Sequence, residues 1–121
     1  MPTRRPAPKK AAATRMPPAV ALKVADLAAW SKDSIVSRML AQNKAGSVTL
    51  FAFDKGQGLS EHTAPFDALV LVLAGRARLT VGGKPIEAGA GQAVLMPAGI
   101  PHAVRAVRRF KMLLVMLRGA A

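Results

Sequence analysis

From Ser34 onward the chain is a series of short apolar stretches separated by turn-forming glycines and prolines. The clearest stretches are SVTLFAF at 47–53, ALVLVLA at 68–74 and FKMLLVML at 110–117, whose residue types favour extended backbone. Between them, Gly82-Gly83 accepts the positive φ of a two-residue hairpin, and Pro97-Ala98-Gly99 ends a strand. Many short strands joined by turns are typical of a β-sandwich or a closed barrel, so we expect an all-β fold.

The remaining elements are expected from the same patterns. Further strands are predicted at 34–40, 76–81, 92–96 and 102–106, and a short helix at 24–30 with Leu27 and Trp30 on one face. The chain has 121 residues and is 51% hydrophobic, which suffices for one domain with one core.

Composition excludes several classes of protein. The absence of cysteine rules out disulfides, thiolate metal ligands and a cysteine nucleophile. No apolar stretch is long enough to span a bilayer. Five prolines before Val20 would break the amphipathic helix of a mitochondrial presequence. We therefore expect a cytoplasmic protein without membrane contact.

The basic residues are concentrated near the N-terminus. The chain carries 18 Lys+Arg against 6 Asp+Glu, a net charge of +12, and six of the basic residues precede the first acidic residue, Asp26. A segment of proline, alanine and basic residues buries too little apolar surface to offset its ordering entropy. We therefore predict a disordered tail over residues 1–20 and a folded domain over 21–121. The tail is either an electrostatic arm for nucleic acid or a solubilising extension.

Two segments share a characteristic spacing of glycine, proline and histidine. In the first, five residues separate Gly56 from His62, and Gly75 closes the segment. The second, running from Gly91 to His102, reads Gly, five residues, Pro-x-Gly, two residues, His. These segments resemble the paired motifs of the cupins, over about residues 34–117. The resemblance implies a double-stranded β-helix, which is a jelly-roll barrel.

The resemblance also implies a metal site, but two of its four ligands are replaced here. Cupins typically hold a metal through two histidines and a glutamate of the first motif and the histidine of the second. Such ligands suit Mn, Fe, Ni or Zn. In this chain Ala64 stands at the second histidine position, Ala68 at the glutamate position and Ala106 at the asparagine position of the second motif.

Two candidate metal ligands, His62 and His102, remain in the motif positions. Asp67 is a third candidate, because Pro65 could break the strand and let the carboxylate turn inward. Without that break, Asp67 differs in parity from position 62 and points outward. Two imidazoles would hold a divalent transition metal only weakly, because catalytic sites normally have three or more protein ligands.

We expect His62 and His102 to face each other across the barrel interior, at a small-molecule pocket that Met96 helps to line. The leading hypothesis is a small-molecule-binding cupin of unknown specificity with a degenerate metal site at the barrel mouth. The alternatives are a metal-dependent enzyme of dioxygenase or isomerase type, and polyanion binding through the tail. The fold hosts many functions, so it does not select a reaction.

Several strands are apolar on both faces, which predicts a homodimer or higher assembly. If the inward face holds the ligand positions, a second row of apolar side chains points outward and needs a cover. The segment around Leu27 and Trp30 could cover only part of this row. At 68–74 the outward residues are Leu69, Leu71 and Leu73. At 110–117 one of two rows also needs a cover, either Phe110, Met112, Leu114 and Met116 or Leu113, Val115 and Leu117.

Overall fold

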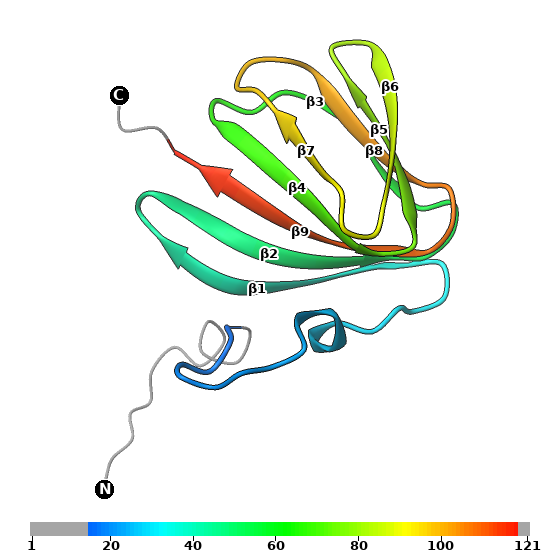
Figure 1. The fold of residues 1–121 in the computed structure, drawn as a ribbon. Coiled ribbons are helices and arrows are strands. Elements are labelled where there is room, and N and C mark those ends of the chain that lie inside the picture. Colours follow the sequence, from blue (N-terminus) through cyan, green and yellow to red (C-terminus); the bar gives the residue numbers. More distant parts are fainter. Residues whose placement is uncertain (1–14, 119–121) are drawn as a thin grey trace, which may run out of the picture.

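The computed structural model describes residues 15–118 and consists of two β-sheets that face each other (Figure 1). The elements are the 3-10 helix η1 (Val24–Leu27) and the strands β1 (Ile35–Asn43), β2 (Gly46–Phe53), β3 (Gly58–His62), β4 (Asp67–Ala74), β5 (Arg76–Val81), β6 (Lys84–Gly89), β7 (Ala93–Met96), β8 (His102–Ala106) and β9 (Phe110–Leu117). The larger sheet has the order β1-β2-β9-β4-β7 and the smaller one the order β3-β8-β5-β6. The predicted all-β jelly-roll barrel is therefore confirmed.

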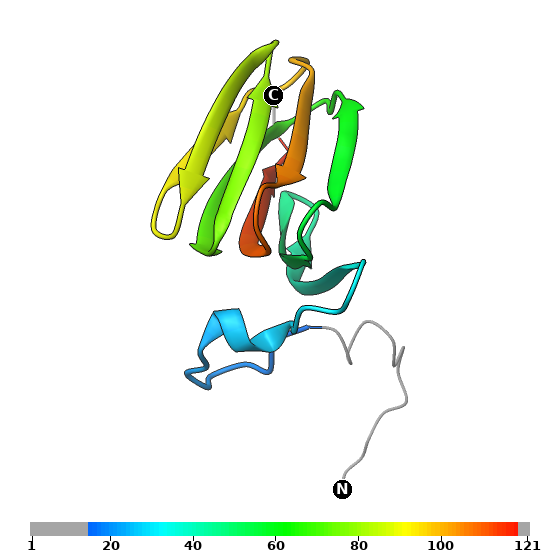
Figure 2. The same cartoon turned by 90° about the vertical axis from the view of Figure 1, so that its right-hand side faces the viewer.

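Figure 2 shows the smaller sheet with its strands β6, β5, β8 and β3 side by side across the view. Between the two sheets lies the main core. Its largest fully buried side chains are the stacked pair Phe53 and Phe110, which are cross-strand partners on β2 and β9 with ring centroids 4.6 Å apart. Val70 and Val72 of β4 and Leu79 of β5 are fully buried beside them. Because successive side chains of a strand point to opposite faces, every second side chain of these strands points into the barrel, and these side chains are apolar.

Two glycine positions set the path of the chain. Gly82 and Gly83 have φ values of 58° and 82° and form the predicted hairpin, with Val81 of β5 paired to Lys84 of β6. Gly75, between β4 and β5, has a φ of 80°, and a Cβ there would lie 2.0 Å from the carbonyl oxygen of Arg109. Only glycine lets β4 turn into β5 so close to the start of β9.

The structure contains two strands that the sequence patterns did not predict, β3 and β6. β6 carries Pro85 and lies at the edge of the smaller sheet, where a missing N–H costs no ladder hydrogen bond. β3 is short, and four of its five residues are exposed, so it lacks an apolar signature. The predicted helix at 24–30 is reduced to the single 3-10 turn η1.

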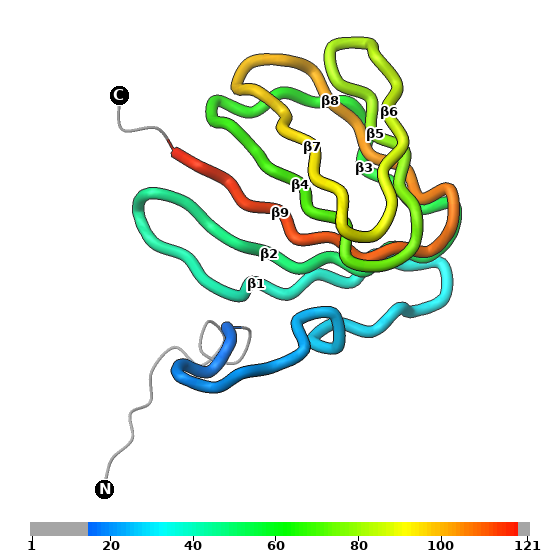
Figure 3. Tube along the Cα trace, in the orientation of Figure 1, coloured from blue at the N-terminus to red at the C-terminus, as the bar shows by residue number. Residues whose placement is uncertain are grey.

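A second apolar cluster lies on the outer face of the larger sheet. The chain before β1 runs beside β1 and β2 (Figures 1 and 3) and places Val24, Leu27 and Trp30 against the buried Leu50 and Ala52. Its N–H at Met16 donates to the carbonyl of Leu40 at 3.1 Å. Met16, which lies within the predicted tail of residues 1–20, therefore contacts the sheet. Residues 1–14 of the predicted tail lie outside the described residues. No helix within residues 15–118 is long and apolar enough to cross a membrane.

Candidate functional site

A β-bulge in β3 aims His62 into the barrel. His62 ends β3, His102 begins β8, and the two are cross-strand partners. Two residues lie between Leu59 and His62, whereas their partners on β8, Val104 and His102, are separated by one. The extra residue turns His62 onto the inner face that Leu59 already occupies. In a regular strand, residues three apart point to opposite faces, so His62 would then face solvent.

The two imidazole rings meet edge to face, with their Nε2 atoms 3.2 Å apart and their centroids 4.4 Å apart. Nδ1 of His62 lies 2.8 Å from the carbonyl oxygen of Ser60, and Nδ1 of His102 lies 3.1 Å from that of Ile100. A carbonyl oxygen can only accept a hydrogen bond, so each Nδ1 is the donor and carries the proton. In neutral rings, both Nε2 atoms then present lone pairs to each other. Such a pair is completed by a cation or by a donor group of a ligand.

Behind the pair lies a narrow cavity of about 40 Å³. His102 is 4% exposed at its wall, whereas His62 is exposed at its mouth. The remaining lining is apolar and consists of Leu59, Ala64, Ala68, Met96, Val104, Met112, Leu114 and Met116. A volume of this size holds about one or two water molecules or an ion, and is far below the usual size of a ligand pocket.

The loops next to the two histidines are joined by hydrogen bonds. The backbone N–H of Gly99 donates to the carbonyl of Ala64 at 2.8 Å, and that of Ala98 donates to the carboxylate of Asp67 at 2.9 Å. These bonds fasten the turn between β7 and β8 to the loop between β3 and β4. Because His62 directly precedes the loop and His102 directly follows the turn, these bonds hold the distance between the imidazoles.

Asp67 is therefore a positioning residue and not part of the histidine pair. Its carboxylate is exposed and engaged by the turn, as its outward parity predicts. Among the described residues there is no group of three or more His, Asp or Glu side chains that could hold a metal ion. The alanines at 64 and 68 line the cavity where the cupin motif would place two further ligands.

The geometry of the histidine pair nevertheless fits two ligands of one metal ion. Two nitrogens at about 2.1 Å from one metal ion are about 3.0–3.4 Å apart for angles between square and tetrahedral. The observed Nε2 separation of 3.2 Å lies in this range. Hydrogen bonds from Nδ1 to carbonyl oxygens are also the usual outer support of metal-binding histidines. The donor set thus fits a weakly held divalent transition metal with two protein ligands.

The structure brings together His62, His102 and Met96, the three residues predicted to contact a ligand. It adds Met112, Leu114 and Met116 of β9, which we had not predicted for the site. The alternation in β9 places these three on one face with Phe110. The pairing of β9 with β2 and β4 decides which face of β9 lines the cavity. This pairing cannot be inferred from the residues of β9 alone.

Comparison with known proteins identifies the family. A model described as a cupin domain matches residues 49–116. A conserved protein of unknown function from Streptococcus pyogenes is 38% identical, with a TM-score of 0.83 over 88% of this chain and 93% of that one. A cupin superfamily protein from Desulfitobacterium hafniense is 31% identical, with a TM-score of 0.81 over 86% of this chain and 95% of that one.

A relative is also found among curated sequences. An uncharacterised protein from Streptomyces coelicolor is 38% identical over 56 residues, which cover 46% of this chain and 53% of that protein. The match thus spans about half the length of the relative. Together with the barrel and the two motif histidines at its mouth, the domain match and the structural likenesses show that this chain belongs to the cupin family.

Proposed function

We propose that this protein is a small-molecule-binding cupin whose ligand meets His62 and His102 at the barrel mouth. The observation that carries the proposal is the orientation of the two rings. Both Nδ1 atoms donate to backbone carbonyls, and both Nε2 atoms are left to accept, 3.2 Å apart. Held imidazoles with free acceptor nitrogens and an apolar cavity beside them are typical of a recognition site.

The size of the cavity limits how the ligand binds. A space of about 40 Å³ admits a functional group, an ion or water, but not a whole organic molecule. The rest of the ligand therefore stays outside, next to the exposed ring of His62. Met96 and Met112, both nearly fully buried, form part of the wall that the inserted group contacts.

A divalent transition metal such as Mn, Fe, Ni or Zn is the cation that we propose for the pair. When bound, it would offer open coordination positions to an oxygen or nitrogen atom of the ligand. His62 and His102 would hold it, and alanine stands at the other two motif positions. Two ligands favour weak, exchangeable binding. This ligand set supports binding better than turnover, so the enzymatic alternative is the weaker one.

Metal analysis and ligand titration test the proposal. We expect protein purified without a histidine tag to carry substoichiometric metal that a chelator removes. A mixture of small organic acids, alcohols and sugars is then screened by ligand-observed NMR, and each hit is titrated into the wild type, His62→Ala and Thr63→Ala. Hits should lose binding in His62→Ala and keep it in Thr63→Ala, the exposed neighbour. Hits that bind His62→Ala as tightly as the wild type would refute the site.

A further inference from the structure

The outer face of the smaller sheet carries two arginines directly opposite each other. Arg78 of β5 and Arg105 of β8 are cross-strand partners. On either side of them, Gly58 of β3 faces Arg105 and Glu87 of β6 faces Arg78. Like charges placed directly opposite on neighbouring strands destabilise a sheet unless an anion screens them.

The one carboxylate in this row is shared and does not reach Arg105. Glu87 accepts from Arg78 at 2.8 Å and from Arg76 at 3.1 Å, and these two bonds hold the pKa of its carboxyl below the usual range. Within residues 15–118, no ion pair or hydrogen bond engages the guanidinium of Arg105. Three guanidinium groups thus face one carboxylate, and the excess charge is centred on Arg105.

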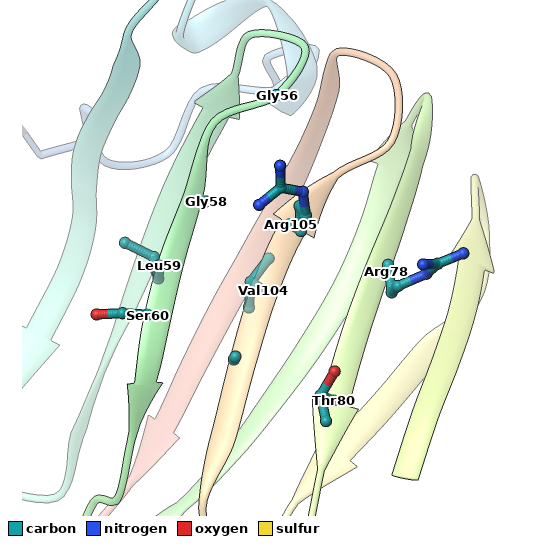
Figure 4. A pocket seen from close by; sticks show the side chains of 9 residues that line it. Gly56, Gly58, Leu59, Ser60, Arg78, Thr80, Val104 and Arg105 are labelled. Carbon is teal, nitrogen blue, oxygen red and sulfur yellow. The ribbon is translucent and has the colours of Figure 1, made fainter. Parts of the chain in front are cut away.

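A hollow lies over this unbalanced charge. Its volume is about 460 Å³, and Arg78, Arg105, Thr80 and Ser60 line it together with small or backbone-exposing residues such as Gly56 and Ala103. Figure 4 shows Arg78 leaning towards β6 and Arg105 rising from β8 on the side of the Gly56 turn, with the hydroxyl of Thr80 lower on β5. A second hollow of about 320 Å³ adjoins it and adds Lys55.

We infer that this hollow binds a small molecule through a phosphate group held between Arg78 and Arg105. The site is separate from the histidine pair. β8 directs Val104 and His102 towards the cavity, and directs Ala103 and Arg105 towards the hollow. The inference therefore does not depend on the function proposed for the barrel mouth.

A phosphate monoester fits this charge arrangement better than a carboxylate. The planar fork of one arginine already occupies both oxygens of a carboxylate. A phosphate dianion has three terminal oxygens, so two arginines on neighbouring strands can bind it from different directions. Thr80 supplies a further hydroxyl donor at the floor. None of the described residues that line the hollow is aromatic, so among them there is no stacking surface of the kind that single-stranded nucleic acid uses.

Titration calorimetry of the full chain at low salt tests the site with two probes, inorganic phosphate and ribose 5-phosphate. We expect saturable binding of both, with ribose 5-phosphate binding more tightly because the hollow is larger than a phosphate ion. Arg105→Gln should lower the affinity for both probes about tenfold, because it removes a pair of charge-assisted hydrogen bonds. Lys84→Gln, on the same sheet but outside the hollow, is the matched control and should leave the affinity unchanged.

A second variant separates shape from charge. Ala103→Leu fills the hollow without changing the charge and should also abolish the advantage of ribose 5-phosphate. Equal losses in Arg105→Gln and Lys84→Gln would show a net-charge effect only and overturn the inference. Equal affinities of the two probes for the wild type would overturn the small-molecule part. Absence of saturable phosphate binding, with a short DNA duplex bound instead through Arg105, would assign the surface to nucleic acid and contradict us.

Discussion

The ammonium group of Lys111 lies 4.6 Å from the ring centroid of Trp30, although the two residues belong to opposite ends of the chain. Lys111 is 9% exposed, and its Nζ donates to the carbonyl of Ala25 at 2.6 Å. The indole N–H of Trp30 donates in turn to the carbonyl of Phe110 at 3.1 Å. The segment before β1 is thus fastened to β9 by a cation–π contact and two hydrogen bonds, over a largely apolar sheet face.

Replacing Trp30 should release this segment. We expect Trp30→Ala to lower the free energy of unfolding by about 2–4 kcal/mol, since it removes a large half-buried side chain and leaves Lys111 without its cover. Trp30→Phe keeps the ring but loses the N–H and should cost about 1 kcal/mol. Urea unfolding measures both. Equal stability of Trp30→Ala and the wild type would show that the segment does not hold the sheet face.

Acid should weaken the turn that contains Asp54. Its carboxylate accepts the backbone N–H of Asp33 at 2.7 Å, and this bond, a further backbone bond from Lys55 and the nearby Arg109 lower its pKa. A carboxyl with a lowered folded-state pKa stabilises the fold above its ordinary pKa and loses this effect as the pH falls through the lowered value. Stability should therefore decline between roughly pH 5 and pH 2, and Asp54→Asn should flatten the decline. Urea unfolding at several pH values measures this decline. If the free energy of unfolding fell as steeply with pH in Asp54→Asn as in the wild type, this role would be excluded.

The part of the larger sheet that the N-terminal segment leaves uncovered should mediate self-association. Leu69, Leu71, Leu95 and Val115 form an outer leucine patch, and they belong to neither apolar cluster of the fold. Leu69 is the cross-strand partner of both Leu95 and Val115, so the patch is continuous across β7, β4 and β9. Leu95 is 54% exposed. The patch is uncharged, so a second copy of the same patch complements it, and we propose a homodimer through this surface.

Sedimentation velocity at micromolar concentration checks the dimer. The wild type should sediment as a dimer and Leu71→Asp as a monomer, because an aspartate in the patch would be buried without a partner. Val107→Asp changes an exposed apolar residue outside the patch and should stay dimeric. A monomeric wild type would refute the association, and a dimeric Leu71→Asp variant would place the interface elsewhere.

Restoring a missing ligand position should turn the weak site into a tight one. Ala64 and Ala68 line the cavity beside the histidine pair. Ala68→Glu buries a carboxylate in an apolar wall, so the metal-free variant should be less stable than the wild type by about 2 kcal/mol or more. Zinc should recover this loss, because ligand binding to the folded state raises its stability. Thermal melts with and without zinc measure both effects. A melting temperature that zinc does not raise would mean that no metal binds between the histidines.

Much of the fold could be predicted because its signals are local. The continuous apolar stretches of β4 and β9 and the glycine pair at 82–83 are readable in short windows, and they predicted the strands and the hairpin correctly. The spacing of the two motifs predicted that His62 and His102 lie close together. The edge strand β6 was not predicted, because Pro85 argues against a strand unless the strand is known to lie at the edge of a sheet.

The unpredicted features of the sites depend on contacts between distant residues. The bulge that turns His62 inward is defined by the two residues of β3 that face one residue of β8. The opposition of Arg78 and Arg105 likewise exists only in the register of β5 with β8. Neither register follows from the residues of a single strand, so the basic hollow could not be foreseen.

The most direct test of the proposed site uses the fact that the chain contains two histidines, both in the pair. A long-range proton–nitrogen correlation spectrum of the imidazole rings, recorded in mildly alkaline buffer, shows which nitrogen of each ring carries the proton. We predict the Nδ1–H form for both rings, and a joint shift of both Nε2 signals that saturates at one equivalent of added zinc chloride. Rings in the Nε2–H form, or a zinc response confined to one histidine, would contradict the account.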